Sequence, residues 1–419
     1  MTHLGVNSAA AAMTRGFSVV CFDKNEAVIG DLAKGRPPVT EPGLDEIFAG
    51  KARLARYTSR PADLGQCDVI YISTDVATDD TGQSDLSRVQ TLIGAVIKEI
   101  RSDAILVILC QVPPGFTRGV ALTKERLYYQ VETLVFGRAV DRAINPERFI
   151  VGCANPQTPL PPAYRTFLDA FGCPILPMQY ESAELAKIAI NCCLVASVSV
   201  ANTLAELCEH TDAVWSEIAP ALKLDKRIGP HAYLSPGLGI AGGNLERDLA
   251  TVIRFANELH TDSGVVKAWV ANSRHRRDWA ARTIKRILLD ARPQSVLAIW
   301  GLAYKENTHS VKNSPSLATI AQLPETALRL HDPVVPAAAA NHAHSVGVAD
   351  PLEALKGADA LLVLTPWPLY RQIAPARIAA TMRGGIVLDP YGVLDANAAV
   401  GAGLEVHTLG RSVMKAAHA

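Results

Sequence analysis

The sequence predicts an α/β protein in which two parallel-sheet domains are joined by a central helical segment. Short apolar runs that close on polar turns alternate with helical patterns over residues 1–176, a mostly helical stretch covers 177–287, and the alternation returns over 288–419. This pattern is typical of doubly wound, Rossmann-like domains, whose ligands bind at the carboxyl ends of the strands. At 419 residues the chain is long enough for two or three domains, each with its own core.

The predicted N-terminal domain lacks its first strand. An Ala-rich helix opens the chain, and a strand over 17–22 follows it and ends in Asp23. This order is the second half of a dinucleotide-binding βαβ unit, in which an acid at the strand end binds ribose hydroxyls and favours NAD over NADP. Gly5 is the one glycine before residue 16, where the fingerprint has more. We expect either a natural start upstream of Met1 or an impaired cofactor-binding half. The intact mass of the protein from its native host distinguishes the two. The alternative to a dinucleotide-binding unit is an ordinary capped helix with Asp23 as a turn residue.

Further elements are predicted from apolar periodicity. Strands are expected at 68–73 and 104–110, as short strands within 134–151, and at 295–300, 328–333, 360–365 and 386–389. A helix is expected over 181–210, with Glu184, Lys187 and Asn191 on roughly one face. Spacing alone favours a snorkelling Lys187 over one that lines a site. Another long helix is expected from a glycine-rich loop to about residue 287, and such a helical middle commonly docks against a second subunit.

Composition argues against several classes of partner. Lys plus Arg and Asp plus Glu both total 41, so the net charge is zero and neither nucleic acid nor an anionic membrane is indicated. The uncharged run 188–205 contains polar residues and is predicted to be a buried helix. Because the N-terminus lacks a basic region followed by an apolar core, a cytoplasmic protein is expected.

The eight cysteines are predicted to be buried free thiols. Most lie in apolar runs, and no pair has the C-x2-C spacing of a zinc or redox site, so no metal centre is expected. They are Cys21, Cys67, Cys110, Cys153, Cys173, Cys192, Cys193 and Cys208.

The most informative stretch is the glycine-rich loop at 233–248. Four glycines between 237 and 243 allow a backbone to approach a ligand closely, and Asp248 follows where helical periodicity resumes. Taken alone, this pattern favours a flexible surface loop. Other segments of the chain change that interpretation.

Many short segments, none decisive alone, follow one another in a definite order. They are Glu-Pro-Gly-Leu at 41–44, Asp-Leu-Ser at 85–87, Val-Pro-Pro-Gly at 112–115, 184–191 with Asn202, Arg-Ile-Gly at 227–229, the loop 233–248, Gly-Leu-Ala-Tyr-Lys at 301–305 with Thr308, Ser-Pro at 314–315, and Ala-Asp-Ala at 358–360 with Thr365 and Trp367. In these segments the chain resembles the UDP-glucose/GDP-mannose dehydrogenase family over nearly its full length.

The resemblance implies an NAD-dependent enzyme that acts on a nucleotide-sugar and pairs as a homodimer through its central helix. In such enzymes the residues matching Lys187 and Asn191 polarise the oxygen being oxidised, and the residue matching Asp248 helps to manage protons. The implied cofactor-binding residues are Gly5, Asp23, Lys24, Gln111 and Lys312. The implied substrate-binding residues are Arg227, which reaches the diphosphate in a neighbouring subunit, with Tyr233, Leu234, Gly237, Gly239 and Lys305.

Departures from the family pattern bear on the mechanism. The family oxidises a primary alcohol twice, and the second oxidation uses a cysteine thiolate in the sequence Gly-Gly-Ser-Cys-Phe-Pro-Lys-Asp. When the chain is aligned on that aspartate, Asn244 takes the place of the cysteine, and Cys192 and Cys193 are expected to point away from the Lys187 face. The family's glutamate-bearing loop is expected to be deleted, leaving at most Glu147. Four more residues differ from those that the family has at the matching positions: Val76, Gln111, Ser197 and Tyr391.

Loss of the thiol with retention of Lys187, Asn191 and Asp248 predicts a two-electron oxidation, from an alcohol to a ketone or aldehyde, on a nucleotide-linked sugar. A catalytically inactive homologue that acts as a binding or partner subunit is one alternative, supported by the missing first strand. A redox-neutral, epimerase-like enzyme with tightly bound NAD is another. The Ala- and Arg-rich composition is typical of a high-GC bacterium, which favours a modified sugar of secondary metabolism.

Overall fold

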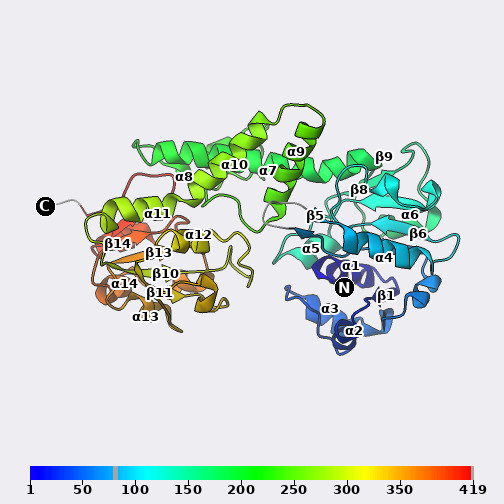
Figure 1. Ribbon diagram of the computed structural model, residues 1–419, viewed down its shortest axis with the longest axis horizontal. Coiled ribbons are helices and arrows are strands. Elements are labelled where there is room, and N and C mark those ends of the chain that lie inside the picture. Colours follow the sequence, from blue (N-terminus) through cyan, green and yellow to red (C-terminus); the bar gives the residue numbers. More distant parts are fainter. Residues whose placement is uncertain (79–83, 417–419) are drawn as a thin grey trace. The chain divides into compact units, whose positions relative to one another are not determined.

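The computed structural model describes residues 1–78 and 84–416, and the chain divides into two compact units, Met1–Ile190 and Asn191–Ala419. Both units contain β-sheets covered by helices, which confirms the predicted α/β class (Figure 1). A polar turn is expected from the sequence after the strand at 68–73, over residues 74–83, and residues 79–83 of it lie outside the described residues. The predicted domain boundaries at 176 and 287 remain predictions, since the helix that begins at Tyr180 continues through the division between the two units.

The strands of the first unit lie in three separate pieces, the smallest of which is a short antiparallel pair. The largest piece has the strand order β3-β6-β7-β8-β9, with β7 and β8 antiparallel, whereas β1 and β2 form a parallel pair of their own. In chain order the elements are α1 His3–Thr14, β1 Val19–Phe22, α2 Glu26–Leu32, α3 Leu44–Gly50, β2 Ala55–Thr58, β3 Val69–Ile72, β4 Ala77–Thr78, β5 Ser84–Asp85, α4 Ser87–Ile97, β6 Ile105–Ile108, β7 Leu127–Gln130, α5 Ala139–Ile144, β8 Phe149–Cys153, α6 Pro162–Asp169 and β9 Ile175–Gln179.

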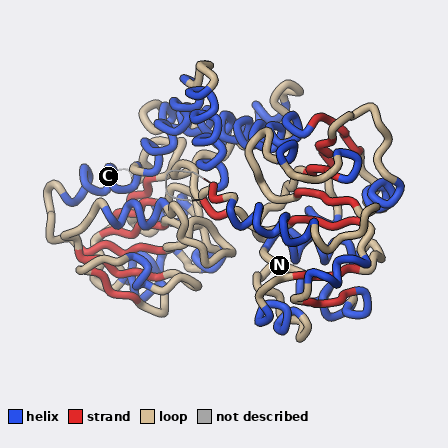
Figure 2. The backbone as a smooth tube through the Cα atoms, turned by 45° about the vertical axis from the view of Figure 1, so that its right-hand side comes forward, coloured by secondary structure: helices blue, strands red, loops and turns tan. Residues whose placement is uncertain are grey.

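The second unit contains a parallel sheet in the order β12-β11-β10-β13-β14-β15. Figure 2 shows its strands in red, with helices around them. With α7, which begins in the first unit, its elements are α7 Tyr180–Cys208, α8 Trp215–Leu224, α9 Asn244–Glu258, α10 Gly264–Arg277, α11 Trp279–Ile284, β10 Val296–Trp300, α12 Pro315–Ala321, β11 Ala327–His331, β12 Ser345–Gly347, α13 Pro351–Leu355, β13 Ala360–Val363, α14 Pro375–Thr381, β14 Ile386–Leu388, α15 Ala396–Gly401 and β15 Glu405–His407. Strand β10 is central and almost wholly apolar, as expected for a parallel strand covered on both faces.

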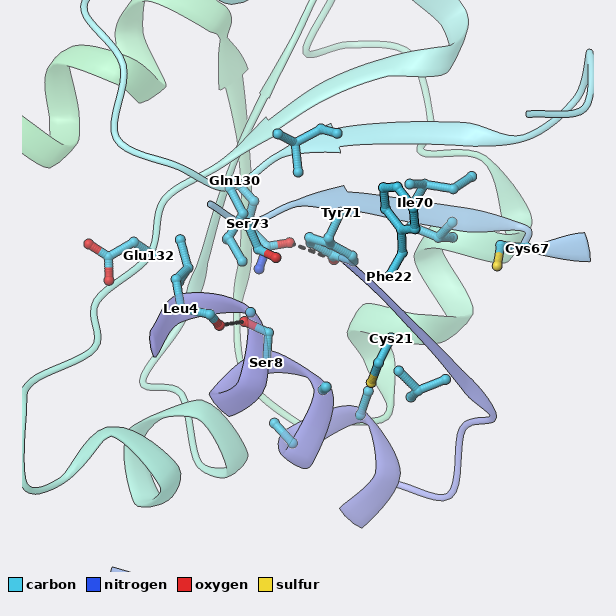
Figure 3. Close-up of a pocket in the computed structure, with 18 of the residues that line it drawn as sticks. Leu4, Ser8, Cys21, Phe22, Cys67, Ile70, Tyr71, Ser73, Gln130 and Glu132 are labelled. Atoms are coloured by element: carbon cyan, nitrogen blue, oxygen red, sulfur yellow. Dashed lines mark hydrogen bonds between the residues drawn. The ribbon is translucent and has the colours of Figure 1, made fainter. Parts of the chain in front are cut away.

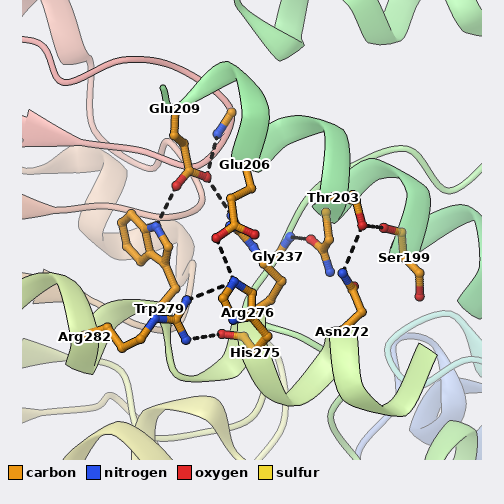
Figure 4. Close-up of polar contacts among 12 residues, drawn as sticks. Ser199, Thr203, Glu206, Glu209, Gly237, Asn272, His275, Arg276, Trp279 and Arg282 are labelled. Atoms are coloured by element: carbon orange, nitrogen blue, oxygen red, sulfur yellow. Dashed lines mark hydrogen bonds and ion pairs between the residues drawn. The ribbon is translucent and has the colours of Figure 1, made fainter. Parts of the chain in front are cut away.

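The carboxyl-terminal half of α7 is fastened to α10 and α11 by a cluster of charged side chains (Figure 4). Glu209 accepts hydrogen bonds from Trp279 Nε1 at 2.8 Å and from Arg276 Nη2 at 2.6 Å, and Glu206 pairs with His275 at 2.7 Å. Arg276 is fully buried, so these carboxylates compensate a guanidinium that has lost its hydration. The cluster therefore holds α10, which supports the glycine-rich loop, in a fixed place on α7.

Two predicted elements are wrong. The single helix expected to reach about residue 287 is three helices, because the chain turns at His260, whose φ is 55°, before α10 begins at Gly264. The strands expected within 134–151 are largely the helix α5, and only β8 lies at the end of that stretch. Both stretches contain turn residues that the apolar pattern alone does not take into account, Thr-Asp-Ser-Gly at 261–264 in the first and Gly137 and Asn145-Pro146 in the second.

Helix α7 is the described helix that is long and apolar enough to cross a membrane by length and composition, over Tyr180–Cys208. A buried helix of a protein core can pass the same test, and 39% of its most apolar window is buried here. Its buried residues include Glu184, Lys187 and Asn191, which are polar.

Replacing Trp300 should destabilise the second unit strongly. Its side chain is fully buried, stacks on Tyr370 with ring centroids 4.8 Å apart and donates from Nε1 to the Pro351 carbonyl at 2.9 Å. We expect Trp300→Ala to lower the free energy of opening by about 3–5 kcal/mol, measured by hydrogen exchange at β10. Val346→Ala is the control, since Val346 is 58% exposed on an edge strand and its loss should change this free energy by less than about 0.5 kcal/mol. Equal effects of the two substitutions would contradict the packing described.

Candidate active site

Polar residues on α7 organise the loops that follow the strands of the first unit. Glu184 is fully buried and accepts hydrogen bonds from the backbone amides of Gly115 at 2.6 Å and Thr117 at 2.8 Å. Burial raises the pKa of Glu184, an effect that these hydrogen bonds oppose. The turn after β6, which begins near Gln111, is therefore held against the helix. Gln111 lies half-buried at the carboxyl end of that strand, where the sequence analysis expects a cofactor contact.

Lys187, one helical turn further along, is buried against a carboxylate that the sequence analysis missed. Its Nζ lies 2.9 Å from Glu132 Oε1, and the two side chains are 11% and 19% exposed. Glu132 stands in the segment after β7, at the carboxyl end of the strand. Lys187 is thus paired and buried rather than snorkelling to solvent, in contrast to what spacing alone favours.

The expectation that at most Glu147 remains as the candidate glutamate of this region is not supported by the contacts. Glu147 is 62% exposed and pairs with Arg142 and Arg148 at the surface. Glu132 is the glutamate that contacts Lys187. A strand end followed by a lone acid, Gln130-Val131-Glu132, is the signal that could have identified it.

In the second unit, Asn191 and Asp248 form a buried pair. Asn191 Nδ2 donates to Asp248 Oδ2 at 2.5 Å, and the residues are 7% and 2% exposed. Arg247 Nε lies 3.5 Å from the other carboxylate oxygen. The structure therefore brings together two of the predicted catalytic residues and orients the Asp248 carboxylate between an amide and a guanidinium.

Asn244 begins α9, one helical turn ahead of Asp248. Gly243 caps the helix with a φ of 91°, a left-handed conformation that favours glycine, and Asn244 is exposed. The first backbone N–H groups of a helix carry partial positive charge, so this position favours an anion or an electron-rich oxygen. The predicted site residue therefore stands at a helix terminus suited to developing negative charge.

The glycine-rich loop is anchored through its backbone by side chains of α7 and α10. The Gly237 amide donates to Asn202 Oδ1 at 2.8 Å, and the Ile240 amide donates to Ser273 Oγ at 2.8 Å. At Gly239, whose φ is 76°, a Cβ would come within 2.3 Å of the Ser273 carbonyl oxygen. The loop is therefore a fixed structure, and the surface-loop interpretation does not describe it.

The remaining predicted substrate residues have different surroundings. Tyr233 is 52% exposed, whereas Leu234 is buried and its carbonyl accepts a hydrogen bond from Trp215 Nε1 at 2.7 Å. Lys305 Nζ lies 5.7 Å from the centre of the Tyr304 ring. Arg227 is 89% exposed and pairs with Asp225 at 2.6 Å, so its guanidinium is held at the surface of the unit.

Two aromatic side chains border the same loop. A Cβ at Gly242 would lie 2.8 Å from Tyr304 Cε2, and one at Gly237 would lie 3.8 Å from Tyr391 Cε1. Burial raises the pKa of Tyr304 to about 12 and raises that of Tyr391 further. Both phenol groups are therefore protonated and uncharged at neutral pH.

A cavity of about 960 Å³ in the first unit contains most of the predicted cofactor residues (Figure 3). It is lined by Gly5, Asp23 and Lys24 and extends to Glu132, the partner of Lys187. Asp23 accepts hydrogen bonds from the Met1 ammonium and from the Asn25 amide, which hold its pKa below the ordinary value although burial alone would raise it. A carboxylate at the end of β1 and a helix start beside it fit the adenosine end of a dinucleotide.

Gly5 allows the amino end of α1 to approach β3 closely, since a Cβ there would come within 3.0 Å of Ser73 Oγ. Lys312, in contrast, belongs to the second unit, where its carbonyl accepts from the Gly242 amide at 3.1 Å. The structure thus groups Gly5, Asp23 and Lys24 in one cavity and places Lys312 against the glycine-rich loop.

The cysteines are all free, and the prediction that they are buried is correct for Cys21, Cys110, Cys153 and Cys208. Cys193 is exposed, because it lies on the outward side of α7. Cys192 is half-buried; burial, and then the charge of Asp248, raise the pKa of its thiol to about 11. At neutral pH this thiol is therefore protonated.

Comparison with known sequences identifies the family. Three family models match successive parts of the chain: the NAD binding domain of the UDP-glucose/GDP-mannose dehydrogenase family at residues 1–165, its central domain at 181–274 and its UDP binding domain at 298–396. The chain belongs to the UDP-glucose/GDP-mannose dehydrogenase family. The family's N-terminal domain indicates NAD as the cofactor, and the residues around Asp23 fit it.

Relatives in this family are similar along their whole length. The UDP-glucose 6-dehydrogenase of Pseudomonas aeruginosa is 29% identical over 413 residues, which cover 92% of this chain and 91% of that protein. The solved UDP-glucose dehydrogenase of Pyrobaculum islandicum is 26% identical with a TM-score of 0.80, covering 94% of this chain and 93% of the other. A solved UDP-D-ManNAc dehydrogenase from Pyrococcus horikoshii shares the fold, with a TM-score of 0.82. It is 20% identical, and the match covers 98% of this chain and 97% of that chain.

The Lys187–Glu132 pair can be tested by removing one charge. We expect Glu132→Gln to lower the free energy of unfolding of the first unit by about 1–3 kcal/mol, because it leaves a buried ammonium without its carboxylate. The measurement is denaturant unfolding with hydrogen exchange to localise the loss. Glu147→Gln is the matched control in the same segment, and its exposed ion pairs should contribute less than about 1 kcal/mol. A Glu132 variant as stable as the control would show that the pair does not form in solution.

Proposed function

We propose that this family member oxidises a CH–OH group of a nucleotide-activated sugar by two electrons, giving a keto or aldehyde sugar, and does not carry the oxidation on to a uronic acid. The observation that carries the proposal is Asn244, which begins α9 one turn ahead of Asp248, at the position aligned with the family's cysteine. An amide side chain cannot form the thiohemiacetal that the second oxidation requires.

The chain retains groups suited to one hydride transfer. NAD, which Asp23 and its neighbours in the cavity of the first unit would hold, would supply the acceptor for the hydride that leaves the carbinol carbon. In the proposed reaction the Asp248 carboxylate accepts the hydroxyl proton, and its orientation is fixed by Asn191 at 2.5 Å. The Lys187 ammonium, positioned by Glu132, stabilises the negative charge that develops on the sugar oxygen. One C–H bond and one O–H bond break and a C=O bond forms, so no covalent enzyme intermediate is needed.

No neighbouring thiol on α7 is suited to replace the missing cysteine. The Cys192 thiol lies near Asp248, but its pKa of about 11 keeps the nucleophilic thiolate a very small fraction at neutral pH. Cys193 is exposed on the other side of the helix. These two observations favour a single oxidation over a second oxidation that uses a cysteine of α7 as the nucleophile.

We further infer that the chain pairs as a homodimer through α7. Val200, Leu204 and Leu207 recur at helical spacing on its surface and are 51%, 40% and 59% exposed. An exposed apolar stripe of this kind is typical of a surface that packs against another helix.

A catalytically inactive homologue, which binds a nucleotide-sugar or a partner subunit, is the second candidate. One observation favours it: the sheet of the NAD-binding unit is divided between β1 and β3. A cofactor site built on a divided sheet is less rigid than one built on a continuous one, which weakens preorganised binding.

The number of NADH molecules formed per sugar decides among these functions. We expect one NADH per sugar consumed when the purified protein is incubated with NAD and a panel of UDP-, GDP- and dTDP-sugars, followed by absorbance and by mass spectrometry of the product. Two NADH per sugar with an acid product would contradict the proposal. Absence of both turnover and NAD binding would favour the inactive homologue.

Restoring the thiol should restore the second oxidation. In the Asn244→Cys variant the thiol stands at the amino end of α9, whose partial positive charge lowers a thiol pKa. We expect this variant to form acid and two NADH per sugar. Asn244→Ser is the matched control and should still form one NADH per sugar, because a serine hydroxyl is a weak nucleophile unless a neighbouring base removes its proton. If the Asn244→Cys variant also stops at one, the missing thiol is not what limits the reaction.

A further inference from the structure

Glu41 is a buried carboxylate in the loop between α2 and α3, where it is 5% exposed. Its Oε1 accepts a hydrogen bond from the Gly137 amide at 2.9 Å, and its Oε2 accepts one from the Ala139 amide at 3.2 Å. His3 Nε2 lies 2.8 Å from the same Oε1. An ionised carboxylate can only accept hydrogen bonds, so this nitrogen carries a hydrogen. Three N–H donors therefore compensate the buried negative charge.

These donors come from two parts of the chain that are far apart in the sequence. His3 begins α1, and its ring stacks on Phe136 with ring centroids 4.0 Å apart. Gly137 has a φ of 82°, a left-handed conformation that favours glycine, and Ala139 begins α5. Glu41 therefore fastens the segment that precedes α5 to the amino end of α1.

The segment between β7 and α5 contains neither a helix nor a strand over residues 131–138, all of which the structure describes. Its course therefore depends on contacts with other elements. The Thr133 carbonyl accepts a hydrogen bond from Arg142 Nε at 2.7 Å, and Glu41 holds the end next to α5. The Arg142 side chain is 26% exposed, whereas that of Glu41 is fully buried. Glu41 is thus the anchor of this segment that water does not reach.

Glu132 lies at the start of the same segment, and the backbone that follows it orients its carboxylate. Oε2 accepts a hydrogen bond from the Leu134 amide at 2.9 Å, and Oε1 lies 2.9 Å from Lys187 Nζ. A shift of the backbone here would therefore turn the carboxylate away from the ammonium. Leu4 of α1 and Glu132 line one cavity (Figure 3), so Glu41 contacts both the helix and the segment that border it.

We propose that Glu41 is a positioning residue for Lys187. Glu41 holds the segment 131–138 against α1, and the segment in turn holds Glu132 where it pairs with the Lys187 ammonium. The inference rests on the proposed function only for the task of that ammonium, which is to stabilise charge on the sugar oxygen. A Glu41 that merely stabilised α1 and α5 would leave the Lys187 pair unchanged in the folded protein.

The reactivity of Lys187 toward acetic anhydride tests the proposal, measured by mass spectrometry on the full chain. A buried lysine that is paired with a carboxylate reacts slowly, because the reagent needs an accessible and deprotonated amine. The exposed Lys34 is the internal reference. Glu41→Gln is the test variant, since an amide offers one acceptor oxygen to the same three donors. Glu46→Gln, which changes an exposed glutamate on α3, is the matched control.

We expect Glu41→Gln to raise the acylation rate of Lys187 relative to Lys34 by about tenfold, and Glu46→Gln to leave it unchanged. Glu132→Gln should raise the rate to a similar extent. The double variant should react no faster than Glu132→Gln alone, because Glu41 acts through Glu132. An unchanged rate in folded Glu41→Gln would overturn the proposal. Effects that add in the double variant would also overturn it, since a general loosening of the unit acts independently of Glu132.

If Glu41→Gln does not fold, as judged by hydrogen exchange in β6, Gly137→Ala tests the same contact from the other side. A Cβ at Gly137 would meet no heavy atom beyond its chain neighbours within 4 Å, so the substitution only disfavours the positive φ that presents the amide to Glu41. Gly172→Ala, at a φ of 67° with the same free space, is the matched control.

Faster acylation of Lys187 in Gly137→Ala alone supports the proposal, and equal rates in the two glycine variants contradict it. Acylation requires neither a sugar nor turnover. A failure of the proposed reaction would therefore not be mistaken for a failure of this inference.

Discussion

Each buried polar side chain of α7 needs a hydrogen-bonding partner, and this requirement fixes the loops of the site. An unpaired polar group in an apolar interior costs several times what a paired one contributes. Four of these residues each hold one loop in place. The pairs are Glu184 with the amides of Gly115 and Thr117, Lys187 with Glu132, Asn191 with Asp248, and Asn202 with the amide of Gly237.

The strands of the two units are held together in different ways. In the second unit β10 pairs on both sides and places Gly301 against Thr365, so the loops beyond it are fixed by a continuous set of hydrogen bonds. In the first unit β1 and β2 contact the rest of the fold through α1 and the helices around it. Side-chain packing holds this part together, but it does not replace the directional bonds of a strand.

The fold was predictable from the sequence where one signal was strong, and the errors lie where signals were weak. Strands such as 296–300 are wholly apolar and bounded by polar residues, so the predicted and the observed strands differ only at their ends. The turn at His260 depends on a positive φ in a residue other than glycine, which composition does not reveal. Glu132 was missed for another reason. Its role comes from its contact with Lys187, which lies 55 residues further along the chain, and the acid after the strand end marks a candidate without specifying that partner.

In the reaction we propose, the position of Asn244 would account for the loss of a covalent step while the rest of the site is retained. The amino end of α9 favours negative charge through its backbone, whatever side chain stands there. A thiolate is one anion that benefits from this field, and a sugar oxygen that loses its proton is another. Replacing a thiol by an amide removes the nucleophile but leaves the field, and it adds an N–H donor. Asp248, one turn later, stays buried and oriented by Asn191, because that pair does not involve residue 244. A single substitution can therefore separate hydride transfer from acyl chemistry at one helix terminus.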